Sequence, residues 1–491
     1  MTSSDKITFL LNGTAVTLSD VRPDTTLLHW LRAEQRLTGS KEGCAEGDCG
    51  ACTVILRNPH DAYDEGRAVN ACILLMGMVA GSAITTIEGV SGPNGALHPV
   101  QQAMITHHGA QCGFCTPGFV MSLYAHWRQG QPFTMAAIDS CLAGNLCRCT
   151  GYRPIIDAAL SLADWPAPAW EQERRQIEDA FCDEMAKAQM SLALETQGQR
   201  FFAPKNLNDC AALIAAHPQA QIVAGATDLG LWLTKQHREF DTFISLKSVQ
   251  ELRRVSIDEE GIVIGAAVTH AEAMHALDSS LPDLGEVWRR FGSSQVRSSG
   301  TVVGNVANGS PIGDISPCLL ALGAEVILRQ GDEQRRLPLS SFFLSYGKQD
   351  RKEGDFLEAI FIPHKDDKAL FIARKLSKRF DQDISAVLMA ACLNKNDSII
   401  TSLALAFGGM AEIPKRATAT EAYLQDRDIA EITIERLKQS LAEDFTPISD
   451  MRASADYRLA AAANMLMQAI QQDNDGHYGL AHHHQGEGGR I

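Results

Sequence analysis

The sequence predicts a multidomain α+β protein, and three observations support this class. The chain has 491 residues, 45% of them hydrophobic and 21% charged, which is an ordinary globular composition with length for about three domains. Apolar residues alternate as in strands over the first 90 residues and then follow a helical period to about residue 165. Nine of the 13 cysteines fall within the first 150 residues. In a reducing compartment, such a cluster predicts metal or redox cofactors rather than disulfides.

Charge and hydropathy argue against two classes of partner. The formal net charge is −15, which disfavours binding to nucleic acid. The N-terminal residues contain no uninterrupted apolar stretch of signal-peptide length, and no window approaches the roughly 20 apolar residues of a membrane span. We therefore expect a soluble, cytoplasmic protein that binds neither nucleic acid nor membrane.

Residues 1–90 form the first predicted domain, which is rich in strands. Two alternating apolar segments flank Asn12-Gly13, and this pattern predicts a β-hairpin with a two-residue turn. A helix is expected next, capped by Asp24 or Thr25 and ending just before Gly39. A loop rich in glycine and cysteine and two further strands complete the domain.

The remaining residues divide into five predicted segments. Residues 91–165 contain four helical stretches broken by Gly, Pro and Cys, which predict a small helical bundle. Residues 166–195 combine a Pro/Ala break with a charged stretch and are interpreted as a linker, in part helical. Residues 196–370 and 371–475 mix strands with helices and predict two α+β domains. Residues 476–491, with three adjacent histidines, are expected to be a disordered tail.

Four cysteines of the first domain follow the spacing of a metal cluster. Three lie on one glycine-rich loop and the fourth follows after nineteen intervening residues: Cys44, Cys49, Cys52 and Cys72. This is the pattern of plant-type [2Fe–2S] ligands. Gly43, Gly47 and Gly50 let the backbone curl so that amide N–H groups point at the cluster sulfurs. The alternative is a structural zinc site, which usually uses closer CxxC pairs.

A second quartet lies in the helical domain as two close pairs: Cys112, Cys115, Cys147 and Cys149. A disulfide between Cys147 and Cys149 would close a strained ring, so a shared metal centre is favoured. Each pair is predicted beside a helix end, and two such ends brought together would make a four-thiolate site inside the bundle. Taken alone this quartet could bind zinc, but its position after the first quartet favours a second [2Fe–2S] cluster. Cys141 fits a helix interior and is left out.

The two quartets, the second within "QCGFCTPG" and "GNLCRCTGYRPI", resemble the iron–sulfur part of the molybdenum hydroxylases. That family includes xanthine dehydrogenase, aldehyde oxidase and carbon monoxide dehydrogenase. The resemblance implies a β-grasp ferredoxin domain followed by a four-helix bundle, each with one [2Fe–2S] cluster. In the family, the bundle cluster lies nearest the molybdenum cofactor, and the glutamine before its first cysteine touches the pterin. That role is implied for Gln111.

Two later segments, residues 222–230 and 291–317, are rich in small residues and resemble the FAD-binding part of the same family. Small residues let the main chain approach a large ligand and offer it amide hydrogen bonds. Taken alone, the first segment could equally be a core strand and its turn. The resemblance implies a two-subdomain α+β FAD-binding domain, like that of vanillyl-alcohol oxidase, and a C-terminal α+β domain. The implied FAD contacts are Ile222, Val223, Ala224, Gly225, Ala226, Thr227, Asp228, Leu229, Phe291, Thr301, Asn305, Asp314, Leu357 and Lys375.

Some of these positions depart from the family pattern or have an alternative interpretation. Ala226 stands where relatives often have Asn, and Asp228 where many have Glu. Lys375 and Asp383 lie in the segment that, in relatives, borders the flavin face where NAD docks. The alternative is that "RKLSKR", which contains Lys375, is a solvated basic run.

The order of the segments implies the function of an electron-transfer subunit, in the xanthine dehydrogenase branch of the family. No molybdopterin domain is recognised in the chain, so a molybdopterin-binding large subunit is the implied partner, in a heterotetramer of two small and two large chains. Hydroxylation would occur at molybdenum in that partner, and no residue of this chain is expected to catalyse it. Electrons would pass from molybdenum through the bundle cluster and the ferredoxin cluster to FAD, and then to NAD+.

Two alternatives to this function remain at the level of the sequence. The substrate could be an aldehyde or an N-heterocycle other than xanthine or hypoxanthine, because the substrate contacts belong to the partner. A function from a different class is a zinc-stabilised interaction protein without flavin.

Overall fold

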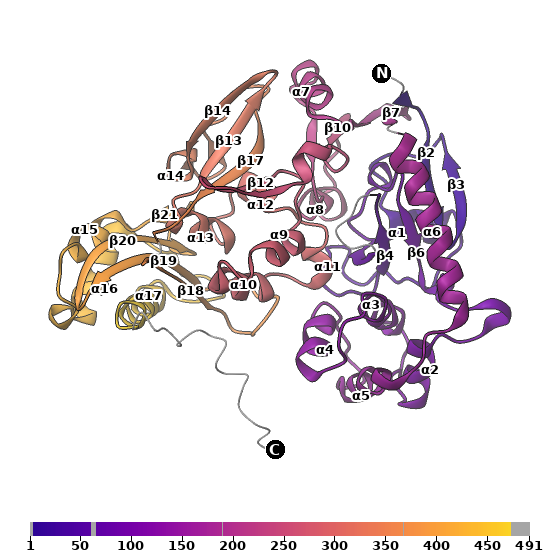
Figure 1. Cartoon of the computed structure of the whole chain (residues 1–491), viewed down its shortest axis with the longest axis horizontal. Helices are drawn as coiled ribbons and strands as arrows, with labels where there is room; N and C mark the ends of the chain where they lie inside the picture. The colour runs from indigo at the N-terminus through magenta and orange to yellow at the C-terminus, as the bar shows by residue number, and fades with distance from the viewer. Residues whose placement is uncertain (1–2, 60–64, 189, 367, 473–491) are drawn as a thin grey trace. The chain divides into compact units, whose positions relative to one another are not determined.

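The computed structural model describes residues 3–59, 65–188, 190–366 and 368–472. Backbone contacts divide the chain into two compact units. Unit 1 comprises Met1–Glu251 and Ser293–Gly300, and unit 2 comprises Leu252–Gly292 and Thr301–Ile491. Figure 1 shows the helices and strands of both units. The predicted tail, residues 476–491, lies outside the described residues.

Unit 1 begins with a mixed five-stranded sheet and one helix, the β-grasp arrangement that was implied. The strands, in the spatial order β3-β2-β6-β4-β5, are Thr14–Leu18, Ile7–Leu11, Ala83–Thr85, Thr53–Arg57 and Arg67–Asn70. Strands β2 and β3 form the predicted hairpin. Asn12 and Gly13 between them have φ of 50° and 81°, the left-handed geometry of a two-residue type I′ turn.

The helix of this part, α1, spans Leu27–Ala33, so it begins later and ends earlier than predicted. Its cap is Thr26, whose hydroxyl accepts a hydrogen bond from the His29 amide at 3.2 Å. The predicted cap Asp24 is engaged elsewhere, because its carboxylate pairs with Arg22 at 2.9 Å and accepts a hydrogen bond from Gln199 at 2.6 Å.

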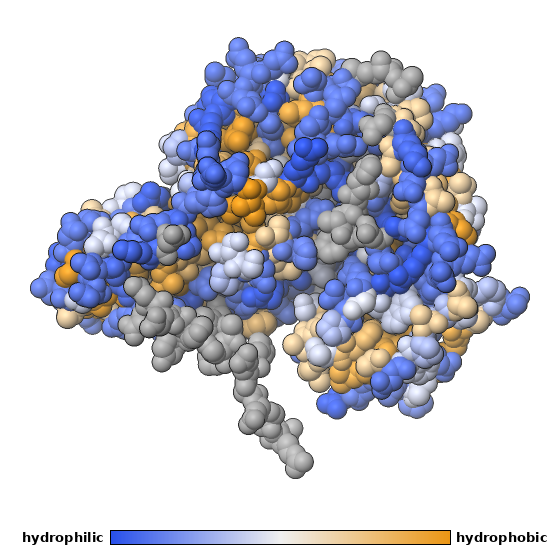
Figure 2. Space-filling model, in the orientation of Figure 1, coloured by the Kyte–Doolittle hydropathy of each residue, from blue (hydrophilic) through white to orange (hydrophobic). Residues whose placement is uncertain are grey.

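Four helices form the bundle predicted for residues 91–165: α2 Pro99–Thr106, α3 Thr116–Arg128, α4 Met135–Leu142 and α5 Arg153–Ser161. Their shared core contains Phe119, Tyr124, Ile138 and Ile155, all of them buried. Side chains cap α2 and α4, and proline stands in the first turn of α2, α3 and α5, where a missing N–H costs nothing. Figure 2 shows hydrophobic residues on the surface over α4 and α5.

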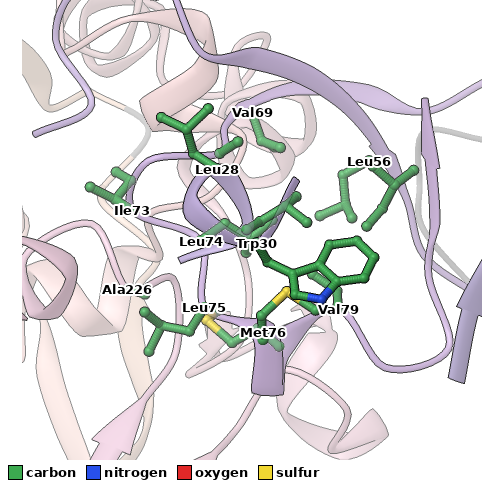
Figure 3. Packing of buried hydrophobic residues seen from close by; sticks show 14 of the residues in the cluster. Leu28, Trp30, Leu56, Val69, Ile73, Leu74, Leu75, Met76, Val79 and Ala226 are labelled. Atoms are coloured by element: carbon green, nitrogen blue, oxygen red, sulfur yellow. The ribbon is translucent and has the colours of Figure 1, made fainter. Parts of the chain in front are cut away.

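A hydrophobic core fills the space between the first sheet and its helix, as Figure 3 shows. Trp30 packs edge-on against Phe9 with ring centroids 5.4 Å apart. Cys52 and Cys72, each 2% exposed, belong to this core. Phe201 belongs to it as well. The beginning of the predicted domain 196–370 therefore shares a core with the predicted domain 1–90.

The segment predicted as a linker, residues 166–195, consists mostly of one packed helix, α6 Ala169–Ala188. Its Glu171 accepts a hydrogen bond from the Tyr124 hydroxyl at 2.7 Å. Its Glu178 pairs with Arg128 at 2.6 Å and accepts a hydrogen bond from Thr85 at 3.2 Å. Both glutamates are buried. Because α6 is bonded to the bundle and to the first sheet, this segment is a structural part of unit 1 rather than a loose connection.

A second five-stranded sheet completes unit 1. Its strands, in the order β1-β7-β8-β10-β9, are Ser3–Ser4, Ser191–Thr196, Gln199–Ala203, Thr242–Ser245 and Gln221–Val223. Unit 1 also contains α7 Leu207–Ala216, α8 Leu229–Thr234 and, in the segment Ser293–Gly300, α11 Ser294–Arg297. Strands β8, β10 and β9 are parallel, so their carboxyl ends lie at one edge.

Unit 2 contains an antiparallel sheet in the order β11-β12-β17-β13-β14, with strands Val255–Ile257, Gly261–Gly265, Phe356–Pro363, Glu325–Gln330 and Glu333–Pro338. A short hairpin follows α14 Leu339–Phe342, with strands β15 Phe343–Ser345 and β16 Lys348–Gln349. The other helices of this part are α9 His270–Leu277, α10 Pro282–Arg289, α12 Val302–Asn308 and α13 Ile315–Ala321.

The last part of unit 2 is a four-stranded sheet with three helices. Strands β18 to β21 are Leu370–Leu376, Val387–Asn396, Ile399–Gly408 and Lys415–Arg416, and they pair in sequence order. The helices are α15 Thr418–Leu424, α16 Ile434–Asp444 and α17 Ala455–Ile470. With both sheets of unit 1, the described residues have the multidomain α+β fold that the sequence predicts.

Candidate metal and cofactor sites

The loop between α1 and β4 carries three cysteines of the first quartet. Gly47 and Gly50 have φ of 80° and 69°, and a Cβ at Gly43 would lie 2.9 Å from Cys49 Sγ, so all three positions favour glycine. The curl of this loop turns two backbone N–H groups toward Cys44 Sγ, each at 3.4 Å. The loop thus presents amide donors to a cysteine sulfur, as predicted.

The fourth cysteine, Cys72, follows β5 and reaches the same site. Its thiol contacts the thiols of Cys44 and Cys52, and Cys44 also contacts Cys49. Hydrogen bonds from Cys49 and Cys72 lower the pKa of Cys44. The pKa of Cys72 is raised by its own hydrogen bonds to Cys44 and Cys52. The structure therefore brings all four predicted ligands together. Four converging thiols with amide donors fit a [2Fe–2S] cluster.

The second quartet lies where two helices of the bundle begin. Cys115 is the N-cap of α3, and Cys147 and Cys149 precede α5. Cys149 Sγ lies 3.5 Å from Cys112 Sγ, and Cys147 contacts Cys115. The two predicted pairs thus interleave across the bundle. Cys112 and Cys149 are exposed, whereas Cys115 and Cys147 are partly buried.

A threonine that sequence reasoning did not single out supports the second quartet. Burial opposes ionisation of Cys147, but the Thr150 hydroxyl at 3.1 Å and the Thr150 amide at 3.5 Å both donate to its sulfur, and the pKa of Cys147 is lowered. Burial raises the pKa of Cys141 to about 12 and favours its thiol form. Burial also raises the pKa of the predicted ligand Cys115 to about 12, so the exclusion of Cys141 remains a prediction from its place in the helix.

Both cysteine loops belong to unit 1 and touch each other. The Leu146 amide donates to the Cys49 carbonyl oxygen at 3.0 Å, so a single hydrogen bond joins the residue before Cys147 to a ligand of the first quartet. In the first quartet the sulfur contacts run from Cys49 to Cys44, Cys72 and Cys52 in turn, and in the second quartet they form two separate pairs. Among the described residues, no three His, Cys, Asp or Glu side chains have the geometry to hold one metal ion. Gln111, with its implied pterin contact, is exposed beside Cys112.

The first predicted flavin segment, Ile222 to Leu229, lies in unit 1 as a strand and its turn. Strand β9 ends at Val223, and α8 begins at Leu229. Ala226 has φ of 59°, a left-handed conformation that Asn and Gly adopt more easily than Ala. A Cβ at Gly225 would lie 2.0 Å from the Ser299 carbonyl oxygen, so the turn packs closely against another segment of unit 1.

The other predicted flavin residues lie in unit 2. Thr301 caps α12 by accepting a hydrogen bond from the Gly304 amide at 3.1 Å. Asn305 Oδ1, one turn later, is buried and has no hydrogen-bond partner among the described residues, which suits a ligand with a donor group. Phe291 packs against His270 with ring centroids 4.6 Å apart, and Leu357 is buried in β17. These features fit a flavin. The individual contacts to FAD remain predictions.

Asp314 and Lys375 form a buried ion pair in unit 2. Lys375 Nζ lies 2.5 Å from Asp314 Oδ2, and the Ser385 hydroxyl donates to Asp314 Oδ1 at 2.5 Å. Arg374, beside Lys375, is also buried and donates to Gln472 at 2.8 Å. The alternative interpretation, that "RKLSKR" is a solvated basic run, is therefore wrong for Arg374 and Lys375. Asp383 is bonded within its own segment, where it accepts from the Lys378 and Arg379 amides at 2.9 and 3.0 Å.

Four protein-family models match the sequence, in an order that agrees with these sites. They are a 2Fe-2S iron-sulfur cluster binding domain over residues 9–77, a [2Fe-2S] binding domain over 86–160, an FAD binding domain in molybdopterin dehydrogenase over 194–365, and a CO dehydrogenase flavoprotein C-terminal domain over 372–473. The chain is thus an iron–sulfur flavoprotein by its domains. It belongs to the molybdenum hydroxylase family of oxidoreductases.

Within that family the chain is similar to xanthine dehydrogenases. The protein of this name from Emericella nidulans is 30% identical over 501 residues, which cover 90% of this chain and 36% of that protein. The one from Oryza sativa is 31% identical over 512 residues, covering 88% of this chain and 37% of that protein. The chain therefore spans little more than a third of the length of these relatives.

Solved structures agree with the fold. A chain of a reconstituted CO dehydrogenase from Oligotropha carboxidovorans matches 56% of this chain and 97% of its own length, with a TM-score of 0.52 and 22% identity. At this identity the likeness concerns the fold alone. Among the described residues, no helix has both the length and the apolar character required to cross a membrane.

Proposed function

We propose that the chain is the electron-transfer subunit of a xanthine dehydrogenase. It would carry electrons from molybdenum in a molybdopterin-binding partner through two [2Fe–2S] clusters to FAD, with NAD+ as acceptor and xanthine or hypoxanthine as substrate of the complex. The observation that supports this most strongly is the pair of four-cysteine sites in one unit, joined by the Leu146 to Cys49 hydrogen bond of 3.0 Å. The similarity to xanthine dehydrogenases supports the substrate class.

Each predicted ligand has a specific part in this proposal. Cys44, Cys49, Cys52 and Cys72 would hold one cluster, and Cys112, Cys115, Cys147 and Cys149 the other. When bound, the clusters supply one-electron carriers and the flavin converts single electrons to a hydride. The amide donors at Cys44 and the Thr150 hydroxyl at Cys147 stabilise thiolate charge at the two sites. The FAD contacts would be Ile222 to Leu229, Phe291, Thr301, Asn305, Asp314, Leu357 and Lys375.

The exposed end of the bundle supports a protein partner. Phe114 is 46% exposed between Cys112 and Cys115, and Leu146 is 42% exposed beside Cys147. Exposed apolar side chains around two exposed thiols suit a surface that another subunit covers. We propose that the molybdopterin subunit docks there, with Gln111 at its pterin, in a cytoplasmic heterotetramer of two small and two large chains.

Cofactor content tests the proposal directly. We expect the purified chain to contain about four irons and four acid-labile sulfides, two of each per cluster, with one FAD and little zinc. Metal analysis, a sulfide assay and the visible absorption spectrum measure these quantities. Stoichiometric zinc without sulfide would show instead the zinc-stabilised interaction protein.

Substitution of Cys147 tests the division of ligands between the two sites. Cys147→Ser is expected to abolish the paramagnetic signal of the bundle cluster and to leave that of the ferredoxin cluster, because the first quartet keeps all its thiols. The matched control is Cys141→Ser, in the same bundle but outside the quartet, which should retain both signals. Loss of both signals in Cys147→Ser, or of one in Cys141→Ser, would contradict the assignment.

Substrate class is tested with the partner present. The chain co-purified with its molybdopterin subunit is expected to reduce NAD+ with xanthine and hypoxanthine faster than with aldehydes or other N-heterocycles. Activity with an aldehyde alone would keep the electron-transfer role and reassign the substrate.

A further inference from the structure

One short segment belongs to unit 1, although in the sequence it lies between two parts of unit 2. Residues Ser293–Gly300 belong to unit 1, whereas the residues on both sides of this segment belong to unit 2. Helix α11 of the segment packs against β5, the strand that leads to Cys72. Its Gln295 has an exposed fraction of 0%. A buried amide of this kind costs stability unless it is hydrogen-bonded.

The Gln295 amide is bonded into a polar network between the two cysteine loops. Its Nε2 lies 3.1 Å from Ser122 Oγ and 3.3 Å from both Asn145 Oδ1 and Thr53 Oγ1. Two of these partners continue to one carbonyl, because the Thr53 hydroxyl donates to the Gly50 oxygen at 2.6 Å and Asn145 Nδ2 donates to it at 3.3 Å. Gly50 lies on the loop of the first quartet, and Asn145 lies two residues before Cys147.

The network surrounds a close backbone contact between the same loops. A Cβ at Gly50 would lie 2.2 Å from the Gly144 carbonyl oxygen, and a Cβ at Gly144 would lie 2.0 Å from Gln295 Oε1. Next to this contact, the Leu146 amide donates to the Cys49 carbonyl at 3.0 Å. Gln295 therefore packs against one loop and is hydrogen-bonded, directly or through one residue, to both.

We propose that Gln295 is a positioning residue for electron transfer between the two cluster sites. Its side chain is hydrogen-bonded to Ser122, Asn145, Thr53 and Ser294 rather than to a cysteine. It acts by holding Asn145 and Thr53 so that the Cys49 and Leu146 backbones stay in contact. The inference rests on the proposed function, in which one electron leaves the bundle site and reduces the ferredoxin site. A residue that only stabilised the fold would change stability without changing the interaction between the sites.

The test compares two buried glutamines of unit 1. Gln295→Met keeps the length and removes the amide that bonds the loops. The matched control is Gln199→Met, because Gln199 is also buried and donates to Asp24 at 2.6 Å and to the Phe240 oxygen at 3.1 Å, outside the quartets. Each full chain is reduced with dithionite, and low-temperature paramagnetic resonance measures cluster content and the magnetic interaction between the clusters. Rapid freezing after substrate addition to the assembled complex measures the transfer rate between them.

We expect Gln295→Met to keep both clusters, to weaken or broaden their magnetic interaction, and to slow the transfer about tenfold, the lower end for losing an outer-shell partner of a metal site. Gln199→Met should leave both quantities at the wild-type value. An unchanged interaction and rate in Gln295→Met, or equal changes in the two variants, would overturn the inference. Absence of the clusters from the unsubstituted chain would instead contradict the proposed function.

A second substitution keeps the inference testable if Gln295→Met does not fold. Gln295→Asn retains the amide but is one methylene shorter, so it should reach fewer of the three acceptors and reduce the magnetic interaction to a smaller extent. A wild-type interaction in Gln295→Asn would count against the positioning role.

Discussion

Replacing Lys375 by Met is expected to lower the free energy of unfolding of unit 2 by about 3–5 kcal/mol, the usual loss when one partner of a buried ion pair is removed. The Lys375 and Asp314 side chains are 2% and 5% exposed, and their charged atoms lie 2.5 Å apart. Without the ammonium group, the Asp314 carboxylate stays buried beside Ser385 but has lost its cation. Urea unfolding of the flavin-depleted chain measures the effect.

Lys378 provides the matched control for this substitution. It lies in the same basic segment but is exposed, and its Nζ donates to the Met451 oxygen at 2.8 Å. Lys378→Met should change the free energy of unfolding by no more than about 0.5 kcal/mol. The double substitution Lys375→Met with Asp314→Leu should recover most of the loss, because an apolar pair can replace a buried ion pair. Equal unfolding midpoints for Lys375→Met and Lys378→Met would contradict the prediction.

The ion pair also changes how Lys375 can act on NAD+ reduction. The resemblance to the family implied that Lys375 lies in the segment that borders the flavin face where NAD docks. In the structure Lys375 is paired with Asp314, itself a predicted flavin contact. An effect of Lys375→Met on NAD+ reduction is therefore expected together with a loss of stability.

Acidification from pH 7 to pH 5 is expected to lower the free energy of unfolding of unit 1 by about 2 kcal/mol through His98 alone. Burial, followed by the nearby Arg174 and Arg128, lowers the pKa of His98 to about 3. Glu171 Oε1 lies 4.0 Å from His98 Nε2, but this carboxylate is already engaged by Arg174 and Tyr124. The unfolded chain binds the proton more tightly than the folded chain. The stability is thus complete above about pH 6.5, the usual pKa of histidine, and falls as the pH decreases toward 3.

His98→Asn should remove this pH dependence. His98 caps α2 through Nδ1, which accepts from the Val100 amide at 3.2 Å, and Asn is also a good N-cap. The variant should be less stable at pH 7, because its smaller side chain loses the edge-on contacts of His98 with the Tyr124 and Trp127 rings, and should lose less stability between pH 7 and pH 5. The control is His108→Asn at an exposed position with φ of 54°, which Asn tolerates. An identical pH slope in His98→Asn and the unsubstituted chain would contradict the assignment.

Features that short-range chemistry controls could be predicted from the sequence. The hairpin at Asn12-Gly13 follows from residues that accept positive φ. The four bundle helices follow from apolar periodicity and from breakers between them. The two cysteine quartets follow from spacing and from loop glycines such as Gly47, whose conformation is a local requirement.

The partners of the buried polar groups could not be predicted and are known from the folded chain. Lys375 pairs with Asp314 across 61 positions, and nothing local in "RKLSKR" distinguishes these buried cations from solvated ones. The sequence of helix α6 resembles a charged linker, because the residues that bond to Glu171 and Glu178 lie on distant elements and cannot be recognised from the local sequence. Gln295 lies 150 positions from Asn145, and only the folded chain brings the two together. The burial of a polar side chain depends on the donors and acceptors that distant segments supply, and sequence periodicity carries no information about them.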